Sequence, residues 1–171
     1  MNEVAETLTD TRLTYIADRE GDIDDLFVEA PIPENSADWL VRVQHRGRCL
    51  ADGGKLDEAL DAAPVLTEIT FERPATNGAK ARQVEQEIKV VRVTLKAPWR
   101  PDRTLPEVTV TALLATEINP PAGVEPLNWL LLTNLAVNTA EEAVEKLSWY
   151  LCRWQVEIFS KSSKAAVALM S

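Results

Sequence analysis

The chain has 171 residues, of which 46% are hydrophobic and 26% are charged, and its formal net charge is -9. This composition fits one globular domain, or one domain carrying an insertion, and argues against disorder throughout. No apolar run reaches the roughly 20 residues that cross a bilayer, and the acidic start lacks the apolar core of a signal peptide. We therefore expect a cytoplasmic protein that does not enter a membrane.

The first third of the chain predicts two strands and two helices. Residues 13–18 form a short, mostly apolar run that is typical of a strand buried on both faces. Residues 19–30 predict a turn into a helix with acidic side chains in its first turn, and prolines follow it. Residues 39–44 alternate like a second strand, and residues 55–62 suggest a short helix.

The middle of the chain changes to a β pattern. Three β-rich runs are separated by Pro, Gly and Asn: 65–71, 84–97 and 107–118. In the second run Ile88 and Val90 alternate, and Val91, Val93 and Leu95 alternate, but the two sets are out of phase. A bulge or a turn near Val90 would explain this slip.

A third region begins after a turn-rich linker. Residues 129–133 predict another buried strand, and Thr139 to Glu142 form a capping box that opens a long helix. Five polar residues share one face of that helix, within about 80° of arc at about 100° per residue. They are Tyr150, Arg153, Glu157, Lys161 and Lys164.

Glu157 borders the apolar stripe of the same helix, where a carboxylate can be held rigidly and still reach an open site. Such a position suits a metal ligand. The spacing is also typical of an amphipathic helix whose charged residues form weak solvent-exposed pairs, which is the more common situation. The spacing by itself does not decide between these interpretations.

Few other side chains are available for metal or thiol chemistry. The chain has one histidine, His45, and two cysteines, Cys49 and Cys152, that form no CxxC pair. Zinc centres built from several imidazoles are thus excluded, and no disulfide framework is expected. Any catalysis must depend on carboxylates, whose hard oxygen ligands suit magnesium or manganese.

Two separate motifs resemble one protein family. The polar face of the last helix follows the spacing Y-x2-R-x3-E-x6-K, which resembles the YREK signature of the IS-four family of DDE transposases, the Tn-five-like cut-and-paste group. Asp18-Arg-Glu-Gly-Asp looks like the DRE motif of that family, which carries the second acid of the catalytic triad. Residues 117–121 and 126–133 also resemble family segments, and residues 39–48 match more loosely. The resemblance covers nearly all of residues 12–164.

The resemblance implies an α/β (α+β) fold, a partial ribonuclease H-like core interrupted by a mostly antiparallel β insertion. Residues 1–64 would belong to the core, residues 65–126 to the insertion, and residues 127–171 to the core again. Asp18 and Glu157 would then be catalytic acids that bind Mg²⁺ or Mn²⁺. Enzymes of this kind use two divalent ions to activate the attacking oxygen and to stabilise the leaving one.

The resemblance also implies contacts with transposon-end DNA. Tyr150, Arg153 and Lys164 would contact its backbone, with Lys161 on the same helix face. Arg42 resembles a phosphate-gripping residue, and Trp129 resembles a tryptophan that stacks on a flipped base. Without the resemblance, Arg42 would be interpreted as an exposed strand cation, Trp129 as a core residue and Asp18 as a helix cap.

The match is incomplete, because only seventeen residues precede Asp18 and they offer no strand for the first catalytic acid. The family also continues beyond the segment that ends here. We therefore expect a truncated transposase that is inactive alone and that self-associates through an exposed sheet edge. The alternatives are a regulatory module that binds DNA ends or intact transposase, and a remnant without a present function.

Overall fold

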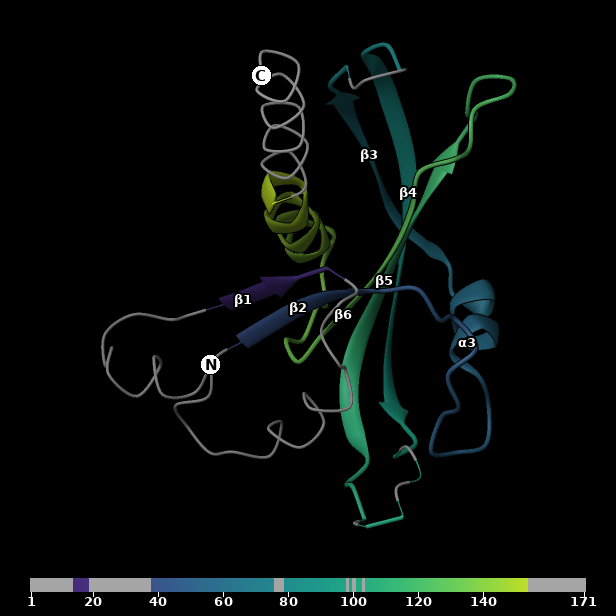
Figure 1. Ribbon diagram of the computed structural model, residues 1–171, viewed down its shortest axis with the longest axis vertical. Helices are drawn as coiled ribbons and strands as arrows, with labels where there is room; N and C mark the ends of the chain where they lie inside the picture. The colour runs from purple at the N-terminus through teal and green to yellow at the C-terminus, as the bar shows by residue number, and fades with distance from the viewer. Residues whose placement is uncertain are drawn as a thin grey trace, which may run out of the picture.

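The fold is a single mixed sheet with helices on both faces (Figure 1). The computed structural model describes residues 14–18, 38–75, 79–97, 99, 101–102 and 104–153. The strands are β1 (Thr14–Ala17), β2 (Asp38–Val43), β3 (Val65–Arg73), β4 (Arg82–Leu95), β5 (Val108–Ile118) and β6 (Asn128–Thr133). The helices are α3 (Leu56–Ala62) and a helix described over residues 140–153, named here the 140–153 helix.

The six strands lie in the order β1-β2-β6-β5-β4-β3. β1 and β2 are parallel, and every other neighbouring pair is antiparallel. The predicted mixed α and β class is thereby confirmed at the level of one mostly antiparallel sheet with two described helices. Residues 65–126, predicted as an insertion, contribute β3, β4 and β5 to this same sheet. The helix predicted at 19–30 lies outside the described residues.

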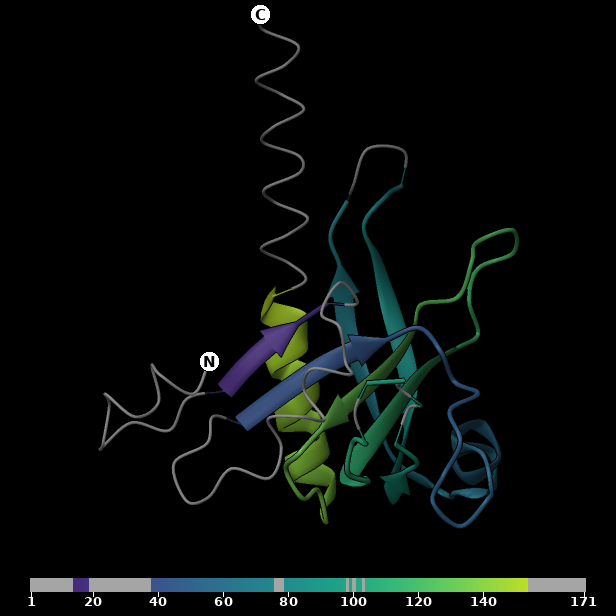
Figure 2. The same cartoon turned by 60° about the horizontal axis from the view of Figure 1, so that its bottom comes forward.

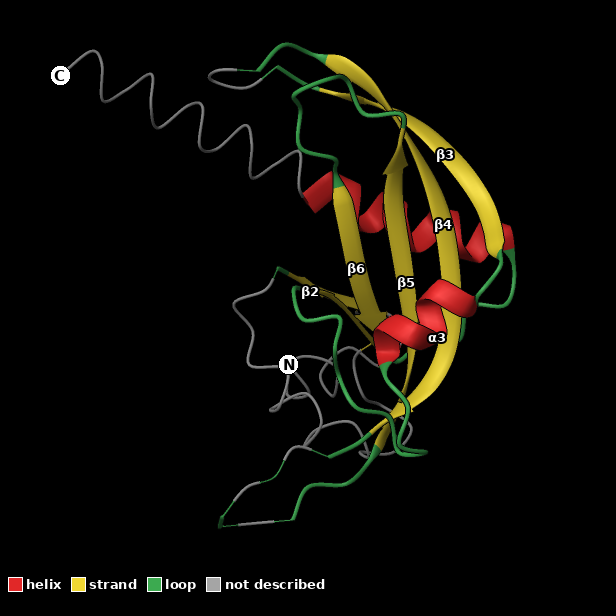
Figure 3. Cartoon of the chain, turned by 90° about the vertical axis from the view of Figure 1, so that its right-hand side faces the viewer, coloured by secondary structure: helices red, strands yellow, loops and turns green. Residues whose placement is uncertain are grey.

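The sheet divides the hydrophobic core into two clusters, because successive side chains of a strand point to opposite faces. On one face, Leu56 and Leu60 of α3 pack with Val41 of β2 in what we call the α3-side cluster. On the other face, Leu147 of the 140–153 helix packs with Leu40 in the helix-side cluster. Figure 3 shows α3 and the 140–153 helix on opposite faces of the sheet. The fold therefore has three layers, helix, sheet and helix, with one core cluster on each face of the sheet.

β4 explains the change of phase that its sequence carries. Ile88 and Val90 pack in the helix-side cluster, whereas Val91, Val93 and Leu95 pack in the α3-side cluster. The pairing of β4 with β5 is continuous over all eleven registered pairs, and the register shift lies in β3, between Val65 and Thr67, opposite Lys89 and Ile88. An irregularity is thus present near Val90, but the extra residue belongs to β3, and the bulge predicted in β4 itself is wrong. The phase changes because the first part of β4 packs its apolar side chains in the helix-side cluster, whereas the second part packs them in the α3-side cluster.

Candidate functional site

The structure describes five of the eight residues that the sequence singled out. These five are Asp18 directly after β1, Arg42 in β2, Trp129 in β6, and Tyr150 and Arg153 in the 140–153 helix. The other three, Glu157, Lys161 and Lys164, lie outside the described residues. The predicted approach of Asp18 to Glu157 thus stays a prediction.

Arg42 connects two of the other four described candidates. Its Nη1 atom lies 3.8 Å from Oδ1 of Asp18. The same nitrogen donates a hydrogen bond to the hydroxyl oxygen of Tyr150, at 3.3 Å and across 108 residues of sequence. The side chains of Arg42 and Asp18 are only 19% and 27% exposed, so water screens their attraction only in part. Three distant segments therefore meet around one guanidinium group.

The parallel pairing of β1 with β2 positions Asp18 beside Arg42. The register sets Ala17 opposite Val41, so the next residues along both strands are neighbours. Ile16 and Leu40, two residues earlier in each strand, both pack in the helix-side cluster. Because side chains alternate between faces, Asp18 and Arg42 emerge on that face as well. Figure 2 shows the 140–153 helix behind β1 and β2.

A capping box fixes the start of the 140–153 helix. The backbone N–H of Glu142 donates to Oγ1 of Thr139 at 3.2 Å, and Oε2 of Glu142 accepts from the N–H groups of Thr139 and Asn138 at 3.3 and 2.6 Å. The capping box predicted from the sequence is therefore confirmed. Hydrogen bonds also lower the pKa of the Glu141 carboxyl, first from its own backbone N–H and then from the Thr139 hydroxyl.

The buried face of this helix brings Tyr150 to the sheet. Ala143, Leu147 and Tyr150 follow one another at helical spacing and are almost fully buried. Arg153 lies three residues further on and is exposed. The helix thus places the ring of Tyr150 in the core and leaves Arg153, one turn further on, exposed.

Tyr150 and Trp129 belong to a buried aromatic group. The ring of Trp129 stacks on Phe71, with centroids 5.5 Å apart, and makes a T-shaped contact with the ring of Tyr150, with centroids 5.2 Å apart. Trp129 is 0% exposed and Tyr150 is 1% exposed. A flipped base could reach Trp129 only if Phe71 or Tyr150 moved away. Stacking of a base on Trp129 stays a prediction, and in this conformation the ring is a core residue.

A second polar cluster was missed by the sequence reasoning. Arg82 of β4 and Glu117 of β5 form a bidentate ion pair, with Nη2 and Oε2 3.0 Å apart, and Glu117 is buried. The hydrogen bond from Arg82 is the largest cause of a lowered pKa at the Glu117 carboxyl, and burial opposes it. The sequence did carry one signal: Glu117 follows Leu113 and Ala115 in phase on a buried face.

The described residues do not by themselves fit a divalent metal ion. In the part of the chain that the structure describes, no group of three or more His, Cys, Asp or Glu side chains could hold one. The carboxylate of Asp18 faces the guanidinium of Arg42, which already balances its charge. A magnesium or manganese site would need Glu157 or another ligand from outside these residues.

Comparison with known families gives no assignment. No protein-family model matches the chain. Among the residues described here, no helix is both long and apolar enough to span a bilayer. The geometry around Arg42 and the motifs in the sequence are therefore the features that point to a function.

Proposed function

We propose that the chain carries part of the catalytic core of a cut-and-paste DNA transposase, with a ribonuclease H-like arrangement, and that the surroundings of Arg42 bind the backbone of a DNA end. One observation supports this most. Asp18, Arg42 and Tyr150 come from three segments that each resemble a family segment, and they meet in space. If the polar residues of the last helix formed only solvent-exposed pairs with one another, there would be no reason to expect Tyr150 to contact Arg42.

The chemistry of Arg42 suits a phosphate. A guanidinium group carries five N–H donors, and the described contacts of Arg42 with Asp18 and Tyr150 both use Nη1. Nη2 and Nε could donate to two oxygen atoms of one phosphate, the geometry that arginine favours. Asp18 and Tyr150 would hold the guanidinium in place, so that less side-chain entropy is lost on binding.

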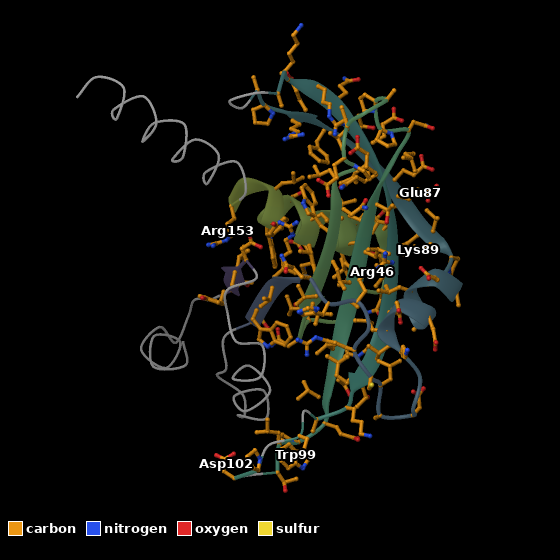
Figure 4. The ribbon with its side chains drawn as sticks, turned by 45° about the vertical axis from the view of Figure 1, so that its right-hand side comes forward. Arg46, Glu87, Lys89, Trp99, Asp102 and Arg153 are labelled. Carbon is orange, nitrogen blue, oxygen red and sulfur yellow. The ribbon has the colours of Figure 1, made fainter. Side chains whose placement is uncertain are left out.

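Arg153 would add a second cation. It lies three residues after Tyr150 and is exposed. Figure 4 shows Arg153 near the end of the described helix, with its side chain projecting away from β4 and β5. Cleavage of DNA would also need Mg²⁺ or Mn²⁺, which the resemblance assigns to Asp18 and Glu157. The proposal gives the described residues the task of binding phosphate only.

A salt titration tests this proposal. Fluorescence anisotropy would measure binding to a labelled duplex of about 20 base pairs, because phosphate contacts do not depend on sequence. We expect Arg42→Gln to weaken binding and to reduce the slope of log K against log salt by about 1. Arg46→Gln is the matched control: Arg46 lies four residues away, is exposed, and pairs with Asp61 at 3.5 Å (Figure 4).

Two results would overturn the proposal. One is a wild-type chain that shows no salt-dependent binding. The other is an Arg42→Gln variant that binds as the Arg46→Gln variant does, although both remain folded by circular dichroism.

A further inference from the structure

A buried polar cluster lies where β4, β5 and β6 meet. Both carboxylate oxygens of Glu117 accept hydrogen bonds from the guanidinium of Arg82. Glu117 is 6% exposed, and its side chain lies on the same face of the sheet as the helix-side cluster. A buried ion pair contributes little to stability in general, because desolvation offsets the attraction. The role of this pair is therefore better found in the backbone groups that Glu117 contacts.

The cluster holds the backbone at the start of β6. The N–H of Leu127 donates to Oε2 of Glu117 at 2.6 Å, and the carbonyl oxygen of Leu127 accepts from Nε2 of Gln86 at 2.7 Å. The N–H of Glu117 donates to Oδ1 of Asn128 at 3.2 Å. Side chains of β4 and β5 thus satisfy both backbone polar groups of Leu127. The loop after β5 is thereby closed at a defined point.

From Leu127, contacts continue without a gap to the candidate site. Trp129 lies two residues further along β6 and so points to the same face. Its ring makes a T-shaped contact with the ring of Tyr150, with centroids 5.2 Å apart, and the hydroxyl oxygen of Tyr150 accepts the hydrogen bond from Arg42. A displacement at the start of β6 would move Trp129 and, through it, Tyr150, whose hydroxyl is the hydrogen-bond partner of Arg42.

We infer that Arg82 and Glu117 are positioning residues for Arg42. They fix the start of β6, which fixes the ring of Trp129 against Tyr150 and so directs the Tyr150 hydroxyl toward Arg42. The importance of this for DNA binding rests on the proposed function. The positioning itself does not, because it concerns contacts within the chain.

At neutral pH the Glu117 carboxylate is charged, which strengthens its contacts with Arg82 and Leu127. The pKa of the Glu117 carboxyl lies below its ordinary value of 4.5, first because of the hydrogen bond from Arg82, and also because of the Leu127 N–H and the positive charge of Arg73. In the described residues, Arg82 on β4 and Arg73 on β3 are the charged groups that shift this pKa. Protonation of Glu117 in acid would weaken its contacts with Arg82 and Leu127 together.

The test removes the ion pair without leaving a buried charge. The double variant Arg82→Met/Glu117→Leu replaces both partners with apolar groups, which proteins tolerate better than the loss of one. The control Thr94→Val/Thr109→Val removes a cross-strand hydrogen bond of 2.8 Å between the same two strands, far from Leu127.

Two readouts separate the inference from the proposed function. The first needs no DNA: the indole N–H proton resonance of Trp129, identified with Trp129→Phe, is followed by NMR from neutral pH into the acid range in which the chain stays folded. The second is DNA affinity at fixed salt. We expect the double variant to shift the Trp129 resonance, to abolish any change that acid causes in it, and to weaken DNA binding by about 2- to 30-fold. The threonine control should leave both readouts unchanged.

The outcomes are distinct. A Trp129 resonance that is identical in the wild type and the double variant, at every pH, would overturn the inference. A shifted resonance in a chain whose wild type binds no DNA would support the positioning and refute the proposed function. If the double variant fails to fold, Glu117→Gln replaces it. This variant cannot titrate at position 117, so a Trp129 resonance that still moves in acid as it does in the wild type would overturn the inference.

Discussion

Replacing Tyr150 with phenylalanine would separate the two roles of this side chain. The ring is 1% exposed and packs against Trp129 at 5.2 Å, whereas the hydroxyl accepts a hydrogen bond from Arg42 at 3.3 Å. Phenylalanine keeps the ring and removes only the oxygen. The variant therefore reports on the contact that joins the helix to β2.

The expected loss of stability follows from that geometry. A hydrogen bond to a charged group contributes about 1.5–3 kcal/mol. The bond to Tyr150 is long, and the Arg42 side chain is 19% exposed, so water replaces part of it. We expect Tyr150→Phe to lower the free energy of unfolding by about 1 kcal/mol, or the melting temperature by about 2–4 °C. Tyr150→Ala, which also removes the ring, should cost about 3–5 kcal/mol.

Urea denaturation followed by circular dichroism would measure both variants. Tyr15→Phe is the control, because Tyr15 on β1 is 44% exposed and the loss of its hydroxyl should change stability by less than about 0.5 kcal/mol. If Tyr150→Phe behaves like Tyr15→Phe, the contact with Arg42 does not hold the helix to the sheet. A loss as large as that of Tyr150→Ala would refute the separation of ring and hydroxyl.

Three further predictions concern the scaffold. Thr139→Ala should lower the free energy of unfolding by about 1 kcal/mol, through loss of the helix cap, and unchanged stability in urea would argue against the capping box. Leu60→Ala should cost about 2–5 kcal/mol, because Leu60 is 0% exposed under the sheet, whereas Asp61→Asn in the exposed pair with Arg46 should cost less than about 1 kcal/mol. The folded-state pKa of Glu117 is lowered, so its stabilising contribution is complete above its ordinary pKa of 4.5 and is lost progressively as the pH falls from there through the folded-state pKa. Urea titrations at pH 7 and pH 4 should therefore show a larger acid loss in the wild type than in Arg82→Met/Glu117→Leu.

Short-range patterns in the sequence predicted the elements well. Alternation and apolar runs marked every described strand, and the short helix at 55–62 corresponds to α3. The order of strands was not readable, because the pairing of β6 with both β2 and β5 is set by contacts between distant segments. The error at Val90 has the same origin: a break in alternation looks like a bulge until the covering of both faces is known.

The sequence allowed the residues of the candidate site to be predicted, but not the contacts between them. The motifs pointed to Asp18, Arg42 and Tyr150, but nothing in the spacing indicated that Tyr150 and Arg42 would bond to each other. Glu117 was in phase with a buried face, yet its partner Arg82 could not be found without the register between β4 and β5. Long-range register is the information that a single sequence withholds.

β4 is shared by both sides of the sheet, and this has a mechanical consequence. Its first half supports the layer under the 140–153 helix, and its second half supports the layer under α3. If either layer unfolded together with β4, the other layer would lose the side chains that β4 contributes to it. Both layers should therefore unfold together as one foldon, and a destabilising substitution in either layer should lower the stability of both.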